Sequence, residues 1–163
     1  MTIGGGGTRD RATYSPWYVS PGEGNELMSY GKAVRDELRV PTRELRHAIP
    51  QVYAGYKELH DAALGAGVLD VKTKELIALA IAVSKQCDGC IAAHAHAAVQ
   101  HGASPEEAAE AIGVTFLMNG GPATIYGARA FSAFQEFYHQ RASQPSAIPA
   151  GQPSGIPAGQ LNR

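Results

Sequence analysis

The amino-acid sequence predicts an all-α protein, a helical bundle that is oligomeric. Apolar residues recur at helical spacing in several segments that proline and glycine separate, and no segment alternates apolar and polar residues between hairpin turns. Of the 163 residues, 44% are hydrophobic and only 18% are charged. Because an average soluble domain carries about 25% charged residues, we expect self-association to cover part of this surface.

Composition divides the chain into three parts. We expect residues 1–40 to form an N-terminal arm and one short helix, residues 41–141 a helical domain, and residues 142–163 a disordered tail rich in proline and glycine. The short helix should begin near Asn25, which can cap a helix, and end at Pro41, which has no backbone N–H to donate.

The helical domain opens with two segments of clear helical pattern. The first starts at Thr42 or Pro50 and stops at Gly65. The second is capped by Asp70 and runs to Val83. Because the second half of this segment is apolar nearly all round, we expect it to be a buried central helix.

Three further helices complete the predicted domain. One follows the cysteine pair and ends at Gly102, a residue that readily adopts a left-handed conformation. The next begins with a capping-box sequence at Ser104 and runs to Met118. The glycines and proline of residues 119–122 separate it from a last helix over residues 123–140.

The two cysteines of the chain, Cys87 and Cys90, are spaced as C-x-x-C, and His94 follows one helical turn later. At about 100° per residue, Cys90 and His94 lie within about 40° of each other on one helical face, so their side chains can meet. Cys87 lies at or just before the helix start, where free N–H groups and the helix dipole favour a thiolate. His96 is about 160° from His94 and should point elsewhere. This pattern is typical of a redox site.

Glu75 is an acidic residue in the helix that precedes the cysteines, immediately before that helix becomes apolar. Two orientations are open. It can be a solvated residue of the first turns, beside Lys72 and Lys74. It can also turn inward, where it would pass protons to and from His94 or a thiol.

Together these residues closely resemble the alkylhydroperoxidase D-like branch of the carboxymuconolactone decarboxylase family, over about residues 50–138. The positions that carry the resemblance are Glu75, Cys87, Cys90, His94, Gly102, Gly120, Gly121 and Pro122. The resemblance implies an all-α bundle that assembles as a homotrimer or hexamer. It also implies that Cys90 attacks, that Cys87 resolves, and that Glu75 and His94 form a proton relay. Some members carry a histidine between the cysteines, where this chain has Gly89, so one relay element is absent.

The function that follows is a thiol-dependent peroxidase or disulfide reductase in antioxidant defence. The Cys90 thiolate would attack a peroxide to give a sulfenic acid, and Cys87 would condense with it to form a disulfide. A dithiol or a protein reductant would then restore both thiols. The same residues could run thiol–disulfide exchange without a peroxide, and neither reaction requires a cofactor.

Three other readings remain open. One is decarboxylation of a carboxymuconolactone-like acid, although the resemblance implies that such decarboxylases lack this cysteine pair. A second is a metal-binding module of Cys87, Cys90 and His94 with Glu75 or His96, which would crowd its ligands into one short stretch without a distant pair. A third is a non-catalytic oligomeric scaffold.

Charge and hydropathy exclude several classes of partner. With 14 Lys plus Arg against 15 Asp plus Glu, the net charge of −1 gives no reason to expect a nucleic acid or an anionic membrane surface. No run of about twenty apolar residues could span a membrane, and the first residues lack the apolar stretch of a signal peptide. We therefore expect a cytoplasmic protein.

The tail contains an imperfect octamer repeat, residues 145–152 and 153–160, with Ile148 and Ile156 as single apolar residues in a polar spacer. It is either a solvated linker or a docking peptide for a groove on a partner. Such peptides resemble the tags that load cargo enzymes into protein nanocompartments (encapsulins). A protein shell is therefore a candidate partner for the tail.

Overall fold

A computed structural model describes residues 29–143, and within this range it contains six α-helices and no strand. The all-α prediction is therefore confirmed for this part of the chain. The predicted helix start at Asn25 and the octamer repeat of the tail lie outside the described residues, so they stay predictions. Within residues 29–143, none of the helices combines the length and hydropathy that a membrane crossing needs.

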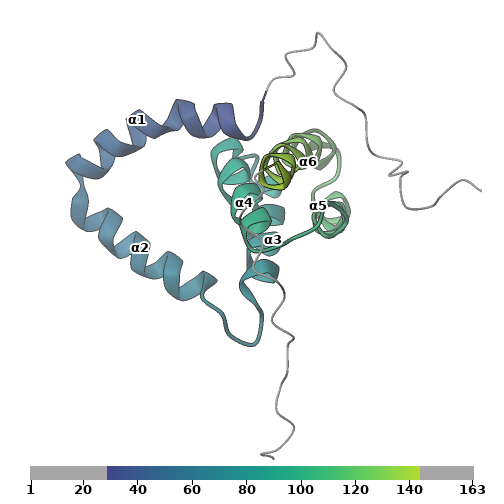
Figure 1. Ribbon diagram of the computed structural model, residues 1–163, viewed down its shortest axis with the longest axis horizontal. Coiled ribbons are helices and arrows are strands. Elements are labelled where there is room, and N and C mark those ends of the chain that lie inside the picture. The colour runs from purple at the N-terminus through teal and green to yellow at the C-terminus, as the bar shows by residue number, and fades with distance from the viewer. Residues whose placement is uncertain (1–28, 144–163) are drawn as a thin grey trace, which may run out of the picture.

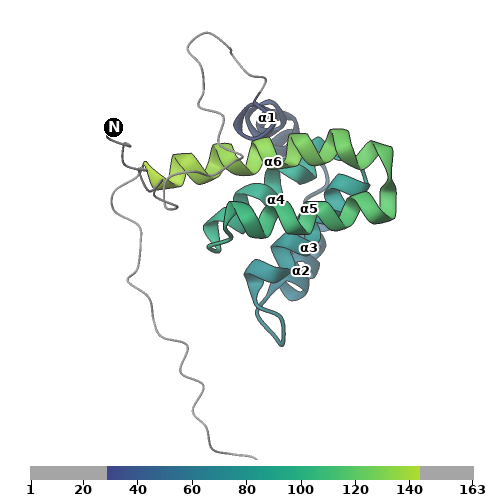
Figure 2. The same cartoon turned by 90° about the vertical axis from the view of Figure 1, so that its right-hand side faces the viewer.

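Four helices form the bundle: α3 (Val71–Ser84), α4 (Asp88–Gln100), α5 (Pro105–Asn119) and α6 (Gly121–Ala142). Helix α6 lies along both α4 and α5, and α3 packs against α4 and α5 from the other side (Figure 2). The core contains few large side chains, chiefly Leu79, Ile91 and Phe134, and many alanines. Small side chains let the helix backbones approach closely.

Local capping signals fix the helix ends where the sequence predicts them. Asp70 accepts a hydrogen bond from the backbone N–H of Thr73 at 2.7 Å. Ser104 and Glu107 form a reciprocal capping box at the start of α5. Gly102 ends the turn after α4 at φ +84°, and Gly120 separates α5 from α6 at φ +60°. Glycine adopts this left-handed conformation without the penalty that other residues have.

The prediction that Pro41 ends the first helix is wrong, because α1 (Lys32–Ala48) runs through it. A proline in a helix leaves the carbonyl four residues earlier, here that of Glu37, without its usual donor. Residues around Pro41 are exposed on most sides of α1, so water can bond to that carbonyl instead. The expected division of the chain at residue 40 falls inside this helix.

Helices α1 and α2 (Pro50–Leu64) form an arm that leaves the bundle and returns to it (Figure 1). We call residues 32–64 the α1–α2 arm. Its base is fixed because Ser29 donates to the Glu136 carboxylate of α6 at 2.8 Å and the N–H of Gly31 donates to it at 3.2 Å. Neither helix of the arm has a buried residue. Helices of this length are marginally stable in water on their own, so the arm should gain stability from a further surface.

The prediction that α3 is a buried central helix is only partly correct. Glu75, Leu79, Ala82 and Val83 are buried, but Ile77 and Ile81 are 46% and 54% exposed. Together with Val114 and Met118 of α5 they line an apolar groove of about 770 Å³, which we call the α3–α5 groove. An exposed apolar surface of this kind is typical of a protein–protein interface.

The sequence predicts self-association as a homotrimer or hexamer, and this stays a prediction. The α3–α5 groove and the exposed α1–α2 arm support it. We expect sedimentation velocity of the full chain to show a species larger than the monomer. Ile81→Glu should shift it toward smaller species, because it places a charge in the α3–α5 groove. Ser132→Glu adds the same charge at an exposed position of α6 and should leave the assembly unchanged. A wild-type protein that sediments as a monomer would contradict the prediction.

Helix α6 packs tightly against side chains of α5 at Gly127. A Cβ built there would lie 2.9 Å from both Ile112 Cγ2 and Phe116 Cε1. We expect Gly127→Ala to lower the free energy of unfolding by about 1–3 kcal/mol through overpacking, as measured by urea denaturation. Gly113→Ala is the matched control, since nothing lies within 4 Å of its Cβ position. That variant should be neutral or up to about 1 kcal/mol more stable. Equal effects of the two substitutions would contradict the overpacking.

Candidate redox site

The structure resolves the orientation of Glu75 in favour of the inward one. Its side chain is buried, with 4% of the residue exposed, although it lies in an early turn of α3. Oε2 is 2.8 Å from Nδ1 of His94 on α4, where the ring donates to the carboxylate. This bond fixes the plane of the imidazole and leaves Nε2 as the nitrogen that can exchange a proton with a reacting group.

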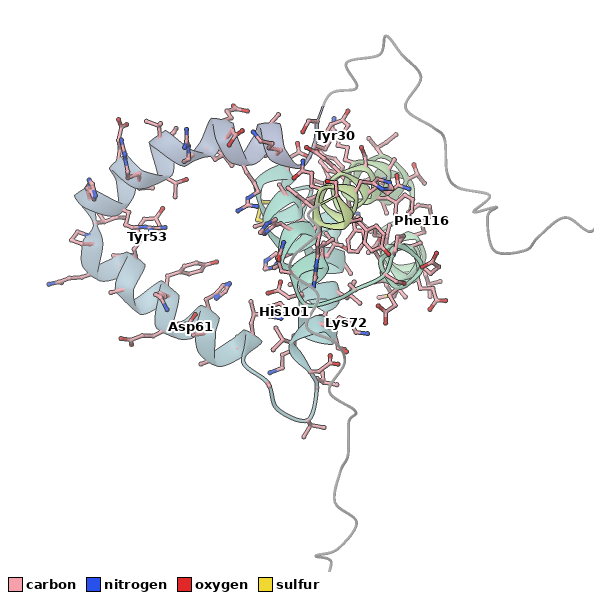
Figure 3. All side chains as sticks on the ribbon, in the orientation of Figure 1. Tyr30, Tyr53, Asp61, Lys72, His101 and Phe116 are labelled. Carbon is pink, nitrogen blue, oxygen red and sulfur yellow. A yellow bond between two sulfur atoms is a disulfide. The ribbon has the colours of Figure 1, made fainter. Side chains whose placement is uncertain are left out.

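The two cysteines lie at the start of α4, as the sequence predicts. Cys87 is the N-cap, and its sulfur accepts a hydrogen bond from the backbone N–H of Cys90 at 3.2 Å. The two residues form a disulfide, with their Cα atoms 5.2 Å apart. Cys87 is partly buried, whereas Cys90 is exposed. Cys90 is therefore the member of the pair that is open to an incoming molecule. The start of α4 faces the α1–α2 arm, since Gly89 lies against Leu38 of α1, and side chains of the arm such as Tyr53 project toward the bundle (Figure 3).

Sequence reasoning missed the ion pair that holds the start of α4. Asp88, between the two cysteines, accepts from Arg129 of α6 at 3.0 and 3.3 Å. The Arg129 guanidinium also lies over the rings of Tyr126 and Tyr30, 4.8 and 5.2 Å from their centroids. The pairing offsets a negative charge that would otherwise oppose a thiolate nearby. An acidic residue inside the C-x-x-C motif was the one available signal, but nothing local identifies a partner 41 residues away.

Helix α1 packs directly against the cysteine motif at Gly89. A Cβ at this position would lie 2.8 Å from Cδ1 of Leu38. Leu38 thus takes the space beside the position at which the resemblance implies a histidine in some family members. This chain has a glycine where those members have a histidine, and a side chain of a neighbouring helix fills part of the space beside it.

The other two histidines of this region lie away from the thiols. His96 is partly buried and meets the ring of Phe137 edge-on at a centroid distance of 5.0 Å. Burial, and secondarily the charge of Arg35, lowers the pKa of His96, so it is neutral at neutral pH. His101 is the exposed C-cap residue of α4. Among residues 29–143, no three His, Cys, Asp or Glu side chains are arranged to hold a metal ion, so the metal-binding alternative gains no support.

A comparison with models of protein families shows to which family this chain belongs. The model of the carboxymuconolactone decarboxylase family matches residues 50–133, slightly more than half of the chain. The chain belongs to this family. The match covers α2 to α5 and most of α6, and therefore includes all four predicted site residues.

Solved structures of family members share the alkylhydroperoxidase D-like fold. A carboxymuconolactone decarboxylase family protein from Legionella pneumophila is 40% identical, with a TM-score of 0.64 over 66% of this chain and 96% of that chain. A family protein from Thermotoga maritima, described as having a possible part in the antioxidative response, is 30% identical. It has a TM-score of 0.57 over 65% of this chain and 93% of its own. A Haemophilus influenzae protein of uncharacterized function is 45% identical over 91 residues, which are 56% of this chain and 80% of the relative.

Removal of the His94 ring should destabilise the family member described here, because the buried Glu75 carboxyl would lose its hydrogen bond. We expect His94→Ala to lower the free energy of unfolding by about 1–3 kcal/mol in urea, with the disulfide intact. Adding Glu75→Leu should restore part of the loss, since both polar partners are then gone. The control His101→Ala, at an exposed site, should change stability by less than about 0.5 kcal/mol. If His94→Ala is as stable as the wild type, Glu75 does not depend on this bond.

Proposed function

We propose that this family member is a thiol-dependent peroxidase or disulfide reductase, with Cys87 and Cys90 as its redox pair. One observation carries the proposal. An exposed Cys90 is bonded to Cys87 at a helix start, and one turn later follows a histidine that a buried glutamate holds. The antioxidative response with which the Thermotoga maritima relative is associated belongs to the same class of chemistry.

The geometry supports unequal roles for the two thiols. Cys90 is the more exposed, and it lies one helical turn before His94, so His94 can take its proton. Glu75 keeps Nδ1 of His94 occupied and stabilises the imidazolium that forms. Cys87 receives the N–H of Cys90 at the helix start, an environment that favours a resolving thiolate.

In the peroxidase cycle, the Cys90 thiolate attacks one peroxide oxygen and the O–O bond breaks. The leaving alkoxide takes a proton from His94, and Cys90 becomes a sulfenic acid. Cys87 then loses its proton and attacks the Cys90 sulfur as a thiolate, and the hydroxide leaves with that proton as water, which gives the disulfide. Two external thiols return two electrons to the pair. When the first step is attack on a disulfide substrate, the same residues act as a disulfide reductase.

Mass spectrometry after alkylation tests the assignment. The reduced wild type, given one equivalent of hydrogen peroxide, should lose both free thiols and gain the Cys87–Cys90 disulfide. In Cys87→Ser, a sulfenic acid should accumulate at Cys90, because no resolving thiol is present.

The reciprocal variant is the control. Cys90→Ser should leave Cys87 largely unoxidised at the same peroxide dose, since it is partly buried and is not one turn from His94. A sulfenic acid on Cys87 in that variant, at the rate of the wild type, would reverse the roles. No oxidation at either position would rule out the peroxidase and leave disulfide exchange.

A further inference from the structure

A basic groove lies between the arm and the bundle. It has a volume of about 820 Å³ and runs between α1 and α4, and we call it the α1–α4 groove. Four arginines of α1 line one side: Arg35, Arg39, Arg43 and Arg46. The other side is formed mainly by uncharged residues of α4 and α6, among them Gly89, Phe137 and the neutral His96.

The four arginines share one face of α1. At about 100° per residue they fall within an arc of about 80°. The acidic residues Glu37 and Glu44 lie on the opposite face by the same geometry and do not line the groove. Asp36 does line it, but it forms an ion pair with Lys32. The groove therefore has a one-sided positive charge.

Within residues 29–143 these arginines have no close ion-pair partner, although the Asp36 carboxylate attracts Arg39 and Arg35 at longer range. The pKa of Asp36 is lowered first by the hydrogen bond from its ion-pair partner and in part by these arginines. No ion pair joins any of the four to a carboxylate in this part of the chain. Arg35 lies 5.6 Å from the ring centroid of Phe137, and Arg46 lies 5.3 Å from that of Tyr53. A guanidinium over a ring keeps its charge and its outward donors available to an anion.

The groove reaches the cysteine motif. Gly89, one of the two residues between the cysteines, lines it, and Leu38 of α1 packs against that glycine. Arg39 is adjacent to Leu38 in the sequence and Arg35 is one turn before it, so both lie near the start of α4. At a rise of 1.5 Å per residue, the row from Arg35 to Arg46 spans about 16 Å. Arg35 and Arg39 thus flank the part of α1 that contacts the motif, and their charge acts across the groove that Gly89 lines.

We propose that the α1–α4 groove binds the carboxylate or phosphate groups of a small anionic thiol, and that this thiol reduces the Cys87–Cys90 disulfide. The proposal rests on the redox function proposed above and adds the charge class of the reductant. The volume is that of a small-molecule site. A row of guanidinium groups suits a molecule with more than one anionic group, because each can accept paired hydrogen bonds.

The reduction balances with two molecules of thiol. A first thiolate attacks the exposed Cys90 sulfur, the Cys87–Cys90 bond breaks, and Cys87 leaves as a thiolate that the Cys90 N–H stabilises. A second thiolate attacks the external sulfur of the mixed disulfide and releases Cys90. The two external thiols become a disulfide, their two electrons reduce the protein, and their two protons remain with the cysteines.

Reduction rates with two thiols of different charge test the proposal. The oxidised full chain is mixed with mercaptosuccinate, which carries two carboxylates, or with uncharged thioglycerol, and free protein thiols are alkylated and measured by mass spectrometry. We expect Arg39→Gln with Arg43→Gln to slow reduction by mercaptosuccinate about 3- to 10-fold and reduction by thioglycerol less than about 2-fold. In 0.5 M NaCl the selective loss should disappear, because salt screens the groove.

The matched control removes two charges from the opposite face of α1. Glu37→Gln with Glu44→Gln should not slow the reduction of the disulfide by mercaptosuccinate. Each thiol is compared with itself across variants, so the intrinsic reactivity of the thiol cancels, and the thioglycerol rate reports whether the disulfide stays accessible.

Two results would overturn the proposal. The arginine substitutions could slow reduction by both thiols equally, or the rate of reduction by mercaptosuccinate could be unchanged by the substitutions and by salt. The arginine face would then be a solvated surface or a contact between copies. Failure of both thiols to reduce the wild type would overturn it as well. Because no peroxide is used, a missing peroxidase activity with intact charge selectivity would count against the proposed peroxidase alone.

Discussion

The geometry of the site depends on how closely α3, α4 and α6 pack. Each of the three helices contributes buried alanines to the core between them, namely Ala82, Ala95, Ala98, Ala130 and Ala133. Their small volume lets α3 approach α4 until the Glu75 carboxyl is 2.8 Å from His94. A hydrogen bond weakens steeply when it is stretched. A larger side chain in this interface would therefore disturb the Glu75–His94 hydrogen bond as well as the core.

Features that depend on local sequence were predicted well. The caps at Asp70 and Ser104 and the left-handed Gly102 involve only residues within a few positions of one another. The placement of Cys87 at a helix start is of the same kind. Glu75 is different, because its pattern fits a solvated turn equally well. The resemblance to a family, and not periodicity, indicated that it matters, and the packing of α4 shows why it faces inward.

The incorrect prediction that the first helix ends at Pro41 also hid the basic face of α1. Helix continuation at a proline depends on whether the carbonyl it leaves free can meet water, which is a property of the tertiary structure. A helix that ends at Pro41 leaves Arg35 and Arg39 in one element and Arg43 and Arg46 in another. The single basic face of α1 becomes visible only when the helix runs through the proline. The partner of Asp88, Arg129, was likewise beyond any local pattern.

Because Leu38 contacts Gly89, the residue type at position 89 and the path of α1 depend on each other. A histidine there would meet Leu38, so α1 would have to shift or Leu38 would have to turn away. Family members with a histidine at this position should therefore differ from this chain in how their first helix approaches the motif. A single letter inside C-x-x-C could then be used to sort related sequences by the architecture around the site, before any of their structures is known.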